Sequence, residues 1–292
     1  MMRSGITKVL AIDGGGTRCR VALDTDGTVT TVETGSANVS TDFTGGVAQI
    51  LAGLRALSEM LDVDTDALTE LPTFVGLAGV TGPEIIARLQ SALPFANIRI
   101  SDDRPAALRG ALGRRDGVIA HCGTGSFYGS QIRGQMRVSG GWGPVLGDEA
   151  SAQWIGRAAL ARTLETVDGR VETSGLAEAL LEQHGGAAGI VRFAGIAQPA
   201  EFGSLAPLVS ARAQIGDALA RCVMQSGADE IARSLPLIGW VPGQKICLTG
   251  GVGPQFAPYL PEAMRTVLEE AAGTPLSGAL SLAKDLAQGT TP

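Results

Sequence analysis

The stretch Leu10-Ala-Ile-Asp13-Gly-Gly-Gly-Thr17 decides the fold, because a related pattern, Val118-Ile-Ala-His-Cys-Gly123-Thr-Gly-Ser126, returns later in the chain. In each copy an apolar run enters a glycine-rich turn that carries a hydroxyl group. An extended segment follows each turn, over residues 19–23 and 127–132, so both copies predict strand, tight turn and strand. A Walker loop or a dinucleotide fingerprint requires a helix at that point. Two glycine turns on hairpins are able to hold a polyphosphate from two sides, which points to ATP.

Composition and charge are those of a globular protein with a large core. The chain has 292 residues, of which 45% are hydrophobic and 18% charged, so it is long enough for one large domain or two of ordinary size. The formal net charge is −6, and no basic run exceeds the pair Arg114-Arg115. This balance argues against nucleic acid and against an anionic membrane surface as partners.

Cysteine placement and the start of the chain indicate a cytoplasmic protein. The four cysteines, Cys19, Cys122, Cys222 and Cys247, never form a CxxC pair, and we expect them to be buried thiols in a reducing compartment. The start, Met1-Met-Arg-Ser-Gly, lacks the apolar core of a signal peptide. No stretch of about 18 uninterrupted apolar residues is present, so no membrane span is expected.

Apolar periodicity and glycine or proline punctuation predict an α/β fold with mixed sheets and crossover helices. Beyond the two hairpins, strands are expected over residues 73–79, 98–101 and 245–249. Helices are expected over residues 46–61, 83–93 and 106–112, from about 148 onward, through a long Ala-rich stretch at 172–235, and at 277–286. This order predicts two related lobes.

Asp13 stands where the first strand meets its glycines. Asp-Gly is a common turn pair, so turn chemistry alone accounts for it. A carboxylate beside phosphates is also able to hold Mg²⁺ through water, and a charged residue that ends an apolar run is rarely buried unpaired. Gly14, Gly15, Gly16 and Thr17 would let backbone amides approach phosphate oxygens without obstruction by a Cβ atom.

A second acidic position follows the short strand at residues 98–101. Asp102 and Asp103 precede Pro105, and an N-cap for the next helix alone would justify an aspartate there. A carboxylate at the carboxyl end of a strand is also placed to accept the proton of a substrate hydroxyl. Spacing does not choose between the two aspartates.

The turn of the second hairpin, at residues 123–126, is explained either by a plain hairpin or by phosphate binding. The first hairpin, which the turn duplicates, favours phosphate binding. His121 and Cys122 lie beside it at the end of the strand, and we expect both to be core residues without a catalytic role.

Polar candidates continue after the second hairpin. Three glycines surround Trp142 in the run at 140–143, and an indole with exposed amides suits a sugar ring. Asp148 serves either as the N-cap of the next helix or as the acceptor for two ligand hydroxyls. Gly250 and Gly251 follow a strand, where they form a plain turn or leave room for a flat adenine.

In order along nearly the whole chain, these motifs resemble the N-acetylglucosamine kinase branch of the sugar kinase/Hsp70/actin superfamily, which also contains the BadF/BadG/BcrA/BcrD-type ATPases. The matching pieces are Ile12-Asp-Gly-Gly-Gly-Thr17, Asn38, Leu77-Ala-Gly79, Ser101-Asp-Asp103, Gly123-Thr-Gly-Ser126, Gly140-Gly-Trp-Gly143, Gly147-Asp-Glu149, Leu248-Thr-Gly-Gly251 and Leu276-Ser-Gly-Ala279. The GGWG run followed by GDE, downstream of GTGS, is the specific part. The chain departs from the pattern at Ala78, where some members carry a hydroxyl, and at the bulky Arg104, which follows the acidic pair.

The resemblance implies two ribonuclease-H-like lobes, as in actin-like ATPases, with an interlobe cleft. One lobe would be residues 1–112 with the C-terminal helix at 277–292, and the other residues 113–276. Asp103 would be the catalytic base, and Asp13 would hold Mg²⁺. The implied sugar-binding positions are Asn38, Gly79, Thr124, Trp142, Gly143 and Asp148. The implied ATP-binding positions are Gly14, Gly15, Gly16, Thr17, Gly123, Thr124, Gly125, Ser126, Gly250 and Gly251.

The activity implied by the resemblance is ATP-dependent phosphorylation of an amino sugar, N-acetylglucosamine or glucosamine, at the 6-hydroxyl, by a protein compatible with a homodimer. The alternative is a BadF-type ATPase that couples ATP hydrolysis to activation of a partner enzyme. Those members hold an iron–sulfur cluster through closely placed cysteines, whereas the cysteines here are scattered. A sugar-responsive repressor or a zinc-bearing glucokinase relative would need a basic helix-turn-helix extension or a Cys-rich motif, and we find neither in this sequence.

Overall fold

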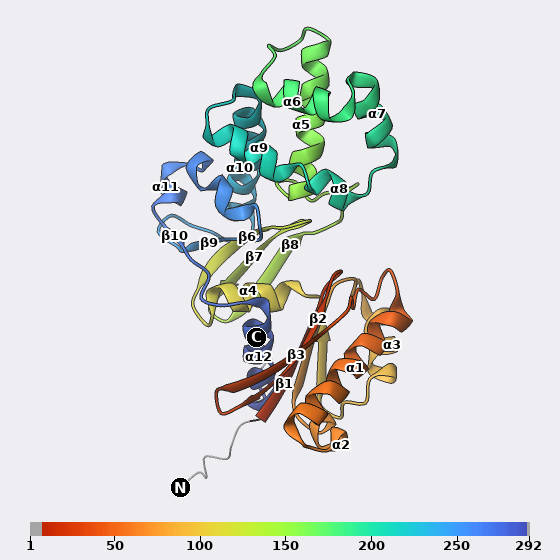
Figure 1. Ribbon diagram of the computed structural model, residues 1–292. Helices are drawn as coiled ribbons and strands as arrows, with labels where there is room; N and C mark the ends of the chain where they lie inside the picture. Colours follow the sequence, from red (N-terminus) through yellow and green to blue (C-terminus); the bar gives the residue numbers. More distant parts are fainter. Residues whose placement is uncertain (1–7, 291–292) are drawn as a thin grey trace. The chain divides into compact units, whose positions relative to one another are not determined.

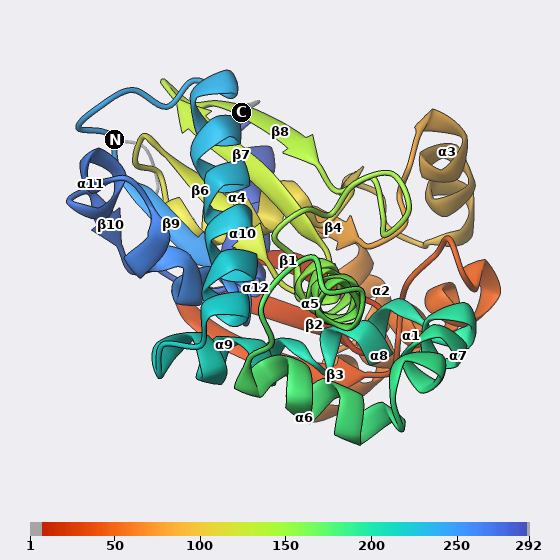
Figure 2. The same cartoon turned by 90° about the horizontal axis from the view of Figure 1, so that it is seen from above.

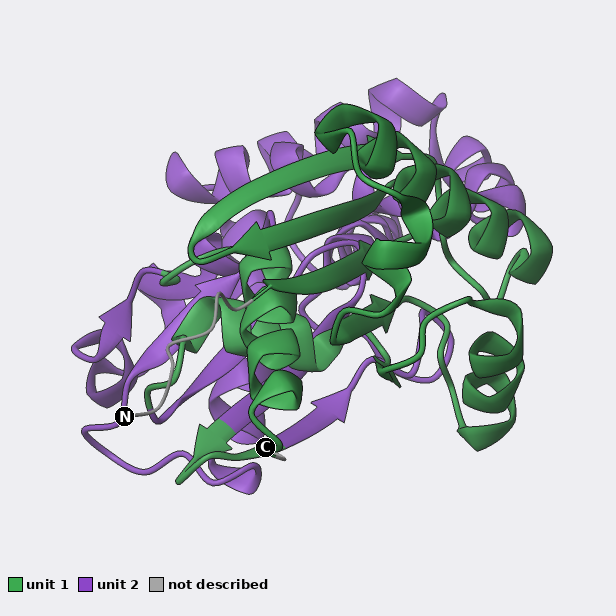
Figure 3. Ribbon diagram, turned by 90° about the horizontal axis from the view of Figure 1, so that it is seen from below, with its two compact units in different colours: residues 1–115, 131–136, 271–292 green, residues 116–130, 137–270 purple. Residues whose placement is uncertain are grey.

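The structure, a computed structural model, describes residues 8–290. The chain divides into two compact units (Figure 3). The first takes in the chain up to Arg115, Gln131–Met136 and the segment from Ala271 on, and the second Asp116–Ser130 and Arg137–Glu270. The chain start, where we expect no signal peptide, lies outside the described residues. Among residues 8–290, none of the helices combines the length and the apolar composition that a membrane crossing requires.

The first unit is built on a five-stranded mixed sheet in the order β3-β2-β1-β4-β5. Its strands are β1 (Lys8–Gly14), β2 (Cys19–Thr25), β3 (Thr28–Thr34), β4 (Thr73–Leu77) and β5 (Ile98–Ser101). β1 pairs with β2 in antiparallel fashion and with β4 in parallel fashion, and β4 is parallel to β5. The predicted strand, turn and strand at the opening motif is therefore confirmed.

The second unit repeats this sheet. Its strand order is β8-β7-β6-β9-β10. When its strands are numbered one to five along the chain, this order is 3-2-1-4-5, the same as in the first sheet. The strands are β6 (Gly117–Cys122), β7 (Ser126–Ile132), β8 (Gln135–Gly140), β9 (Ile246–Thr249) and β10 (Leu268–Glu269). Both copies even turn alike after their second strand, because Asp26-Gly27 and Arg133-Gly134 have positive φ angles, as a type I′ turn requires. The predicted fold class, a mixed α/β protein with two related lobes, is confirmed.

Helices cover both faces of the first sheet (Figure 1). These helices are α1 (Phe43–Leu61), α2 (Thr65–Thr69), α3 (Pro83–Ala92), α4 (Arg104–Leu112) and α12 (Pro275–Ala287). Leu10 and Ile12 of β1 are buried in the cluster that contains α1 residues, whereas Val9 and Ala11 are buried in the cluster that contains α12 residues. A strand whose alternate residues are both covered reads as a continuous apolar run, which is why β1 is so visible in the sequence.

α4, whose first turn follows Asp103, is held tightly against α12. A Cβ atom at Gly278 would lie 2.0 Å from the carbonyl oxygen of Ala106, so the two helix backbones meet without side chains between them. Buried Arg109 donates from Nη1 to Asp285 Oδ2 at 2.8 Å. The close backbone approach and this buried ion pair join α4 to α12, and Asp103 lies directly before the first turn of α4.

Helices fill most of the second unit, where β8 and β9 are separated by a long helical segment. Its helices are α5 (Ala152–Val167), α6 (Gly175–His184), α7 (Ala187–Ile196), α8 (Pro199–Gly203), α9 (Ala206–Gln214), α10 (Ala218–Leu237), η1 (Gly253–Tyr259) and α11 (Glu262–Arg265). α10 lies against β6, as seen from above in Figure 2. The stretch at 172–235 is helical, as predicted, and consists of several helices; Gly185 and Gly186, for example, adopt positive φ angles and end α6.

Candidate active site

The first glycine turn is tied to two neighbouring loops by its own backbone. Gly15 donates to the carbonyl of Arg18 at 2.9 Å, Ala37 donates to the carbonyl of Gly15 at 3.0 Å, and Ala78 donates to that of Gly14 at 2.8 Å. A Cβ atom at Gly14 would lie 2.5 Å from Leu77 Cδ2, so only glycine fits there. The turn is consequently rigid, and the other two loops are brought to the same place.

A small cavity of about 190 Å³ opens at this turn. Its lining residues are Asp13, Gly15, Gly16, Thr17, Arg18 and Arg20. Glycine amides together with two guanidinium groups are the groups that bind phosphate oxygens in proteins. The predicted phosphate turn thus has cations beside it, which the sequence interpretation had not assigned to the site.

Asp13 ends β1 in a buried position and forms an ion pair with Arg20. Burial raises the pKa of the Asp13 carboxyl, although the Arg20 guanidinium opposes that rise. A largely desolvated carboxylate beside a phosphate cavity suits a hard divalent cation, which prefers oxygen ligands. Among residues 8–290, no group of three or more His, Cys, Asp or Glu side chains is placed to hold a metal ion alone. Asp13 thus offers a single carboxylate to such a cation, which would need its other ligands from elsewhere.

The structure separates the roles of the two neighbouring aspartates. Asp102 is engaged by Arg104, whose backbone N–H and Nε donate to Asp102 Oδ1 at 3.0 and 2.7 Å. Asp103 occupies the N-cap position of α4, but its side chain makes no capping hydrogen bond. Capping, one of the two interpretations of this position, is therefore not what its carboxylate does.

The environment of Asp103 turns its carboxyl into a base that titrates near neutral pH. Burial raises its pKa to about 6, and the negative charges of Asp102 and Asp13 add to this rise. A general base is most effective when its pKa lies near the working pH. A half-buried carboxylate at a helix start, with two like charges around it, is typical of catalytic positions.

Asn38 and Gly79 lie side by side in the first unit. The backbone N–H and the Oγ of Ser40 donate to Asn38 Oδ1 at 3.0 and 2.8 Å. Gly79 has a φ angle of +88°, and a Cβ atom there would lie 2.5 Å from Asn38 Oδ1. The loop thus engages the carbonyl end of the Asn38 side chain and fixes the direction of its NH₂ group.

Parallel strands bring these residues of the first unit to one sheet edge. Asp13 is in register with Gly76, and Gly76 with Ser101, so β1, β4 and β5 end together. A Cβ atom at Gly76 would lie 3.6 Å from the Cα of Asp103. Ligands of α/β proteins bind outside the carboxyl ends of such strands. Asp13 and Asp103 thus share the edge at which a ligand is expected.

In the second unit, Asp148 is tied to the second glycine turn. Its carboxylate is buried and accepts hydrogen bonds from the backbone N–H groups of Ser126 and Gly143. Burial raises its pKa, and these two bonds oppose the rise. The N-cap interpretation of Asp148 is wrong, because α5 begins at Ala152 and its N-cap is Ser151.

Trp142 lies on a loop with unusual backbone and exposed apolar side chains. Gly140, Gly141 and Gly143 all have positive φ angles, so the loop needs its three glycines. The Trp142 side chain is 75% exposed. An exposed indole is a costly surface feature unless something covers it, and a sugar face is a suitable cover.

Cys122 is fully buried in the core of the second unit, as expected, whereas His121 is only half-buried. The His121 ring stacks on Phe127 with 5.0 Å between centroids, and its Nδ1 lies 3.0 Å from Thr249 Oγ1. Burial lowers the pKa of His121 to about 4 and raises that of the Cys122 thiol to about 12. His121 is therefore neutral at physiological pH, and Cys122 remains a thiol. Of the other cysteines, Cys222 is exposed, so the expectation that all four are buried is wrong for it.

A pocket of about 610 Å³ begins at the second turn. It is lined by Gly123, Thr124, Ala152, Gly203, Ala206, Pro207, Ser210, Ala211, Gln214, Gly251, Val252 and Gln255. Gly250 itself packs against the strand end, because a Cβ atom there would lie 2.3 Å from the carbonyl oxygen of Cys122. The sequence interpretation missed the wall from α8 and α9, although small residues recur there at helical spacing.

The predicted site residues fall into two groups. Those in the first unit are Asp13, Gly14, Gly15, Gly16, Thr17, Asn38, Gly79 and Asp103. Those in the second unit are Gly123, Thr124, Gly125, Ser126, Trp142, Gly143, Asp148, Gly250 and Gly251. Within each unit the structure brings these residues to the turn and the loops next to it. Each unit thus carries a glycine turn with polar side chains on the loops next to it.

The paired hairpin sheets with glycine turns define a protein of the two-lobed kinase and ATPase fold. The chain belongs to the BadF/BadG/BcrA/BcrD ATPase family, whose pattern matches residues 10–275. The glucosamine kinase GspK of Vibrio cholerae is 26% identical over 278 residues, which are 94% of this chain and 95% of that protein. The N-acetylmuramic acid/N-acetylglucosamine kinase of Clostridium acetobutylicum is 29% identical over 262 residues, 84% of this chain and 85% of that protein.

A solved structure agrees with this assignment. A Chromobacterium violaceum protein, provisionally named an N-acetylglucosamine kinase, is 30% identical with a TM-score of 0.81. The match covers 95% of this chain and 99% of that chain. The similarity thus extends over nearly all of both proteins and includes both repeated sheets.

Proposed function

We propose that this protein transfers the γ-phosphoryl group of ATP to the 6-hydroxyl of an amino sugar, N-acetylglucosamine or glucosamine. Its relatives are named as kinases of these sugars, and the family is named for ATP use. In this proposal residues 1–112 with 277–292 form one functional lobe and residues 113–276 the other.

The carboxylate of Asp103 is the observation that carries the proposal. In the transfer, the sugar O6 forms a bond to the γ-phosphorus, the bond from that phosphorus to the bridging oxygen of ADP breaks, and the O6 proton passes to Asp103. A carboxyl with a pKa of about 6 accepts this proton near neutral pH. General bases of this kind contribute about 10² to 10⁴ in rate.

The two glycine turns would hold the phosphates. The amides at residues 14–16 and 123–125 meet phosphate oxygens, and Arg18 and Arg20 supply positive charge in the first cavity. Asp13 would hold Mg²⁺ through water, and the bound ion would neutralise charge on the phosphates. Positioning and charge neutralisation carry most of the catalysis in phosphoryl transfer, which suits a site with few reactive side chains.

The organic parts of the two substrates would occupy different loops. Asn38 and Gly79 in the first unit, and Thr124, Gly143 and Asp148 in the second, would bind sugar hydroxyls and the group at C2, while the Trp142 ring covers an apolar sugar face. The adenosine would enter the pocket of about 610 Å³ beside Gly250 and Gly251, because small residues there leave space for a flat ring.

A coupled assay for ADP release tests the proposal. The purified protein is given ATP and Mg²⁺ with each of N-acetylglucosamine, glucosamine, N-acetylmannosamine, glucose and a no-sugar control. We expect turnover with at least one of the two proposed amino sugars, and a product whose phosphate is on O6 by NMR. ADP release that is equal with and without every sugar would contradict the kinase activity and favour the ATPase alternative.

A further inference from the structure

α9 forms one wall of the pocket in the second unit. This wall starts beside the second glycine turn. The backbone N–H of Ala152 donates to the carbonyl of Gly123 at 2.8 Å. A Cβ atom at Gly203, just before α9, would lie 3.6 Å from the Cβ of Ala152. The beginning of α9 is therefore next to the place where the phosphates are proposed to bind.

The far end of α9 carries a pair of carboxamides. α9 has nine residues, and at 1.5 Å per residue its last residue, Gln214, lies roughly 12 Å along the helix. Gln214 Nε2 donates to Gln255 Oε1 of η1 at 3.0 Å. The pocket thus runs from the amides of the glycine turn at one end to a hydrogen-bonded carboxamide pair at the other. A nucleotide has its phosphates and its base at opposite ends in the same way.

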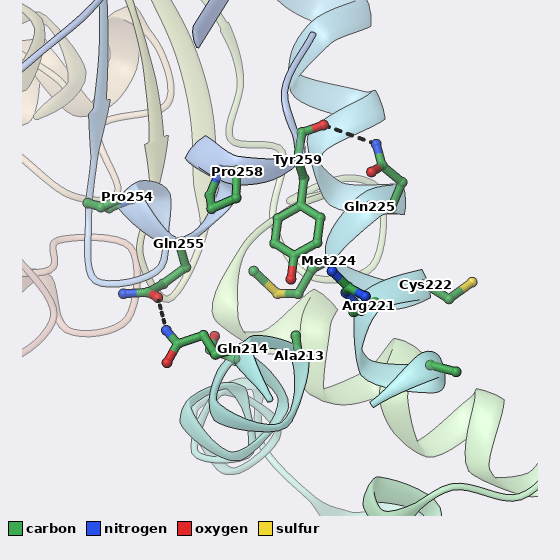
Figure 4. A pocket seen from close by; sticks show the side chains of 12 residues that line it. Ala213, Gln214, Arg221, Cys222, Met224, Gln225, Pro254, Gln255, Pro258 and Tyr259 are labelled. Carbon is green, nitrogen blue, oxygen red and sulfur yellow. Dashed lines mark hydrogen bonds between the residues drawn. The ribbon is translucent and has the colours of Figure 1, made fainter. Parts of the chain in front are cut away.

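A second cavity of about 720 Å³ lies directly beyond this pair. The two cavities share Gln214, Gln255 and Ser210 as lining residues. Figure 4 shows the Gln214–Gln255 hydrogen bond at one side of the second cavity and the Tyr259 ring near Met224 in its interior. The pair is consequently a partition between two hollow spaces.

We propose that the Gln214–Gln255 pair recognises the edge of the nucleotide base, and that the cavity beyond it receives substituents on that edge. The inference rests on the proposed use of ATP. The hydrogen bond within the pair engages one donor of Gln214 and the acceptor of Gln255, which leaves Gln214 Oε1 as an acceptor and Gln255 Nε2 as a donor. Adenine offers the complement, an N6 donor beside a ring-nitrogen acceptor, and carboxamides are its usual partners.

The orientation of the pair predicts discrimination between purines of equal size. Inosine presents a carbonyl oxygen and an N–H where adenine presents an amine and a ring nitrogen. In the orientation that the pair adopts, the Gln214 acceptor would face the carbonyl oxygen of inosine and the Gln255 donor would face its N–H. We therefore expect ITP to have a KM about tenfold above that of ATP, with kcat much less affected, because one or two hydrogen bonds distinguish the bases.

Steady-state kinetics with ATP and ITP test the pair. In Gln214→Leu and in Gln255→Leu the ratio of the two KM values falls toward one, mainly because the KM for ATP rises. Gln183→Leu, which removes an exposed carboxamide on α6, is the matched control and keeps the wild-type ratio. An unchanged ratio in both pair variants would overturn the assignment.

The second cavity is tested independently with N6-benzyl-ATP as phosphoryl donor. We expect its KM to lie within about tenfold of that of ATP, because the benzyl group enters a space walled by Met224, Tyr259 and prolines. Ala218→Trp, an exposed position at the rim of that cavity, should block N6-benzyl-ATP while ATP still serves. Failure of N6-benzyl-ATP with the wild type would overturn this half of the proposal.

A binding measurement separates failure of this inference from failure of the proposed function. Calorimetric titration with ADP, IDP and N6-benzyl-ADP does not require a sugar. One outcome is that no sugar is phosphorylated, yet ADP binds about tenfold more tightly than IDP to the wild type and equally tightly to the pair variants. In that case the assignment of the base-binding pair stands although the kinase activity is contradicted. Sugar phosphorylation with equal affinity for ADP and IDP would overturn the base assignment and leave the kinase activity in place.

Discussion

The two glycine turns occupy the same place in two copies of the same sheet, yet their chemistry is opposite. The first turn is preceded by Asp13, which pairs with Arg20 and shares its sheet edge with Asp103. The second is preceded by His121, whose pKa burial lowers to about 4, so the strand end is neutral at physiological pH. Its acidic neighbour, Asp148, is held by backbone N–H groups.

The comparison teaches that the fold repeats the glycine turn in both units, whereas an acidic residue stands at the end of the strand before the turn only in the first unit. The repeat explains why both turns have the same backbone, and the residues at the strand ends decide what each turn does. We therefore expect changes of charge in the first unit to affect the chemical step, and changes at the second turn to affect binding of the nucleotide.

The largest effect is expected from Asp103→Asn. The amide is isosteric but does not accept the sugar proton, so kcat falls by about 10³-fold. Asp102→Asn is the matched control one residue away, because Asp102 is engaged by Arg104; its kcat stays within about threefold of the wild type. Equal losses in the two variants, measured by ADP release with saturating sugar, would remove the distinction between the aspartates.

A smaller loss, about 10²-fold in kcat, is expected from Asp13→Asn, which removes a carboxylate proposed to act on the phosphates through the metal ion. That variant also leaves the half-buried Arg20 guanidinium without its carboxylate partner and is therefore less stable. Asp13→Asn/Arg20→Met removes both charges. We expect it to recover thermal stability without recovering activity, whereas recovery of both would show that the pair is only structural.

The glycines after β9, which pack beside the second turn, are expected to respond to the size of the side chain. Gly250→Ala places a Cβ atom 2.3 Å from a carbonyl oxygen at a φ angle of +80°, which costs roughly 1 to 3 kcal/mol and lowers the melting temperature by several degrees. Gly251→Ala meets no atom within 4 Å and is the adjacent control, with no measurable change in melting temperature. Equal melting temperatures in the two variants, by calorimetry, would contradict the tight approach at Gly250.

A stability effect of similar or smaller size is expected at Asp103. Its folded pKa of about 6 lies above the usual value of 3.8, so the stability it contributes is present at low pH and is lost as the pH rises through 6. At pH 8, Asp103→Asn removes a charge that burial disfavours and raises the free energy of unfolding by roughly 1 to 3 kcal/mol. At pH 4 or below the gain vanishes. Denaturant titration at the two pH values distinguishes this from a loss of folding.

Much of the fold follows from local patterns in the sequence. Buried strands appear as apolar runs that end in glycine, Pro83 marks the first turn of α3, and α12 shows helical spacing. The breaks within 172–235 are harder to predict, because its Ala-rich composition suits a helix throughout. The shortest elements, such as β10, carry too few residues for any periodicity.

The sequence indicates which residue types make up the candidate site, but it does not indicate the contacts that these residues make. Spacing left Asp102 and Asp103 equivalent; in the structure Arg104 donates to Asp102, whereas the Asp103 side chain makes no capping hydrogen bond. The left-handed backbone of Asp148, with a φ angle of 64°, is set by the loop around it and has no sequence signal. Gln214 and Gln255 lie far apart in sequence, so their contact depends on the tertiary packing of α9 against η1.

The central claim is that Asp103 is the base of the phosphoryl transfer, and the pH profile of kcat/KM for the amino sugar tests it most directly. For the wild type we predict a fall of about tenfold per pH unit below pH 6, where protonation removes the base, and a plateau above it. In Asp103→Asn the residual activity should lack this inflection. An inflection near pH 6 that persists in Asp103→Asn, or a wild-type profile that is flat from pH 5 to 8, would contradict the account.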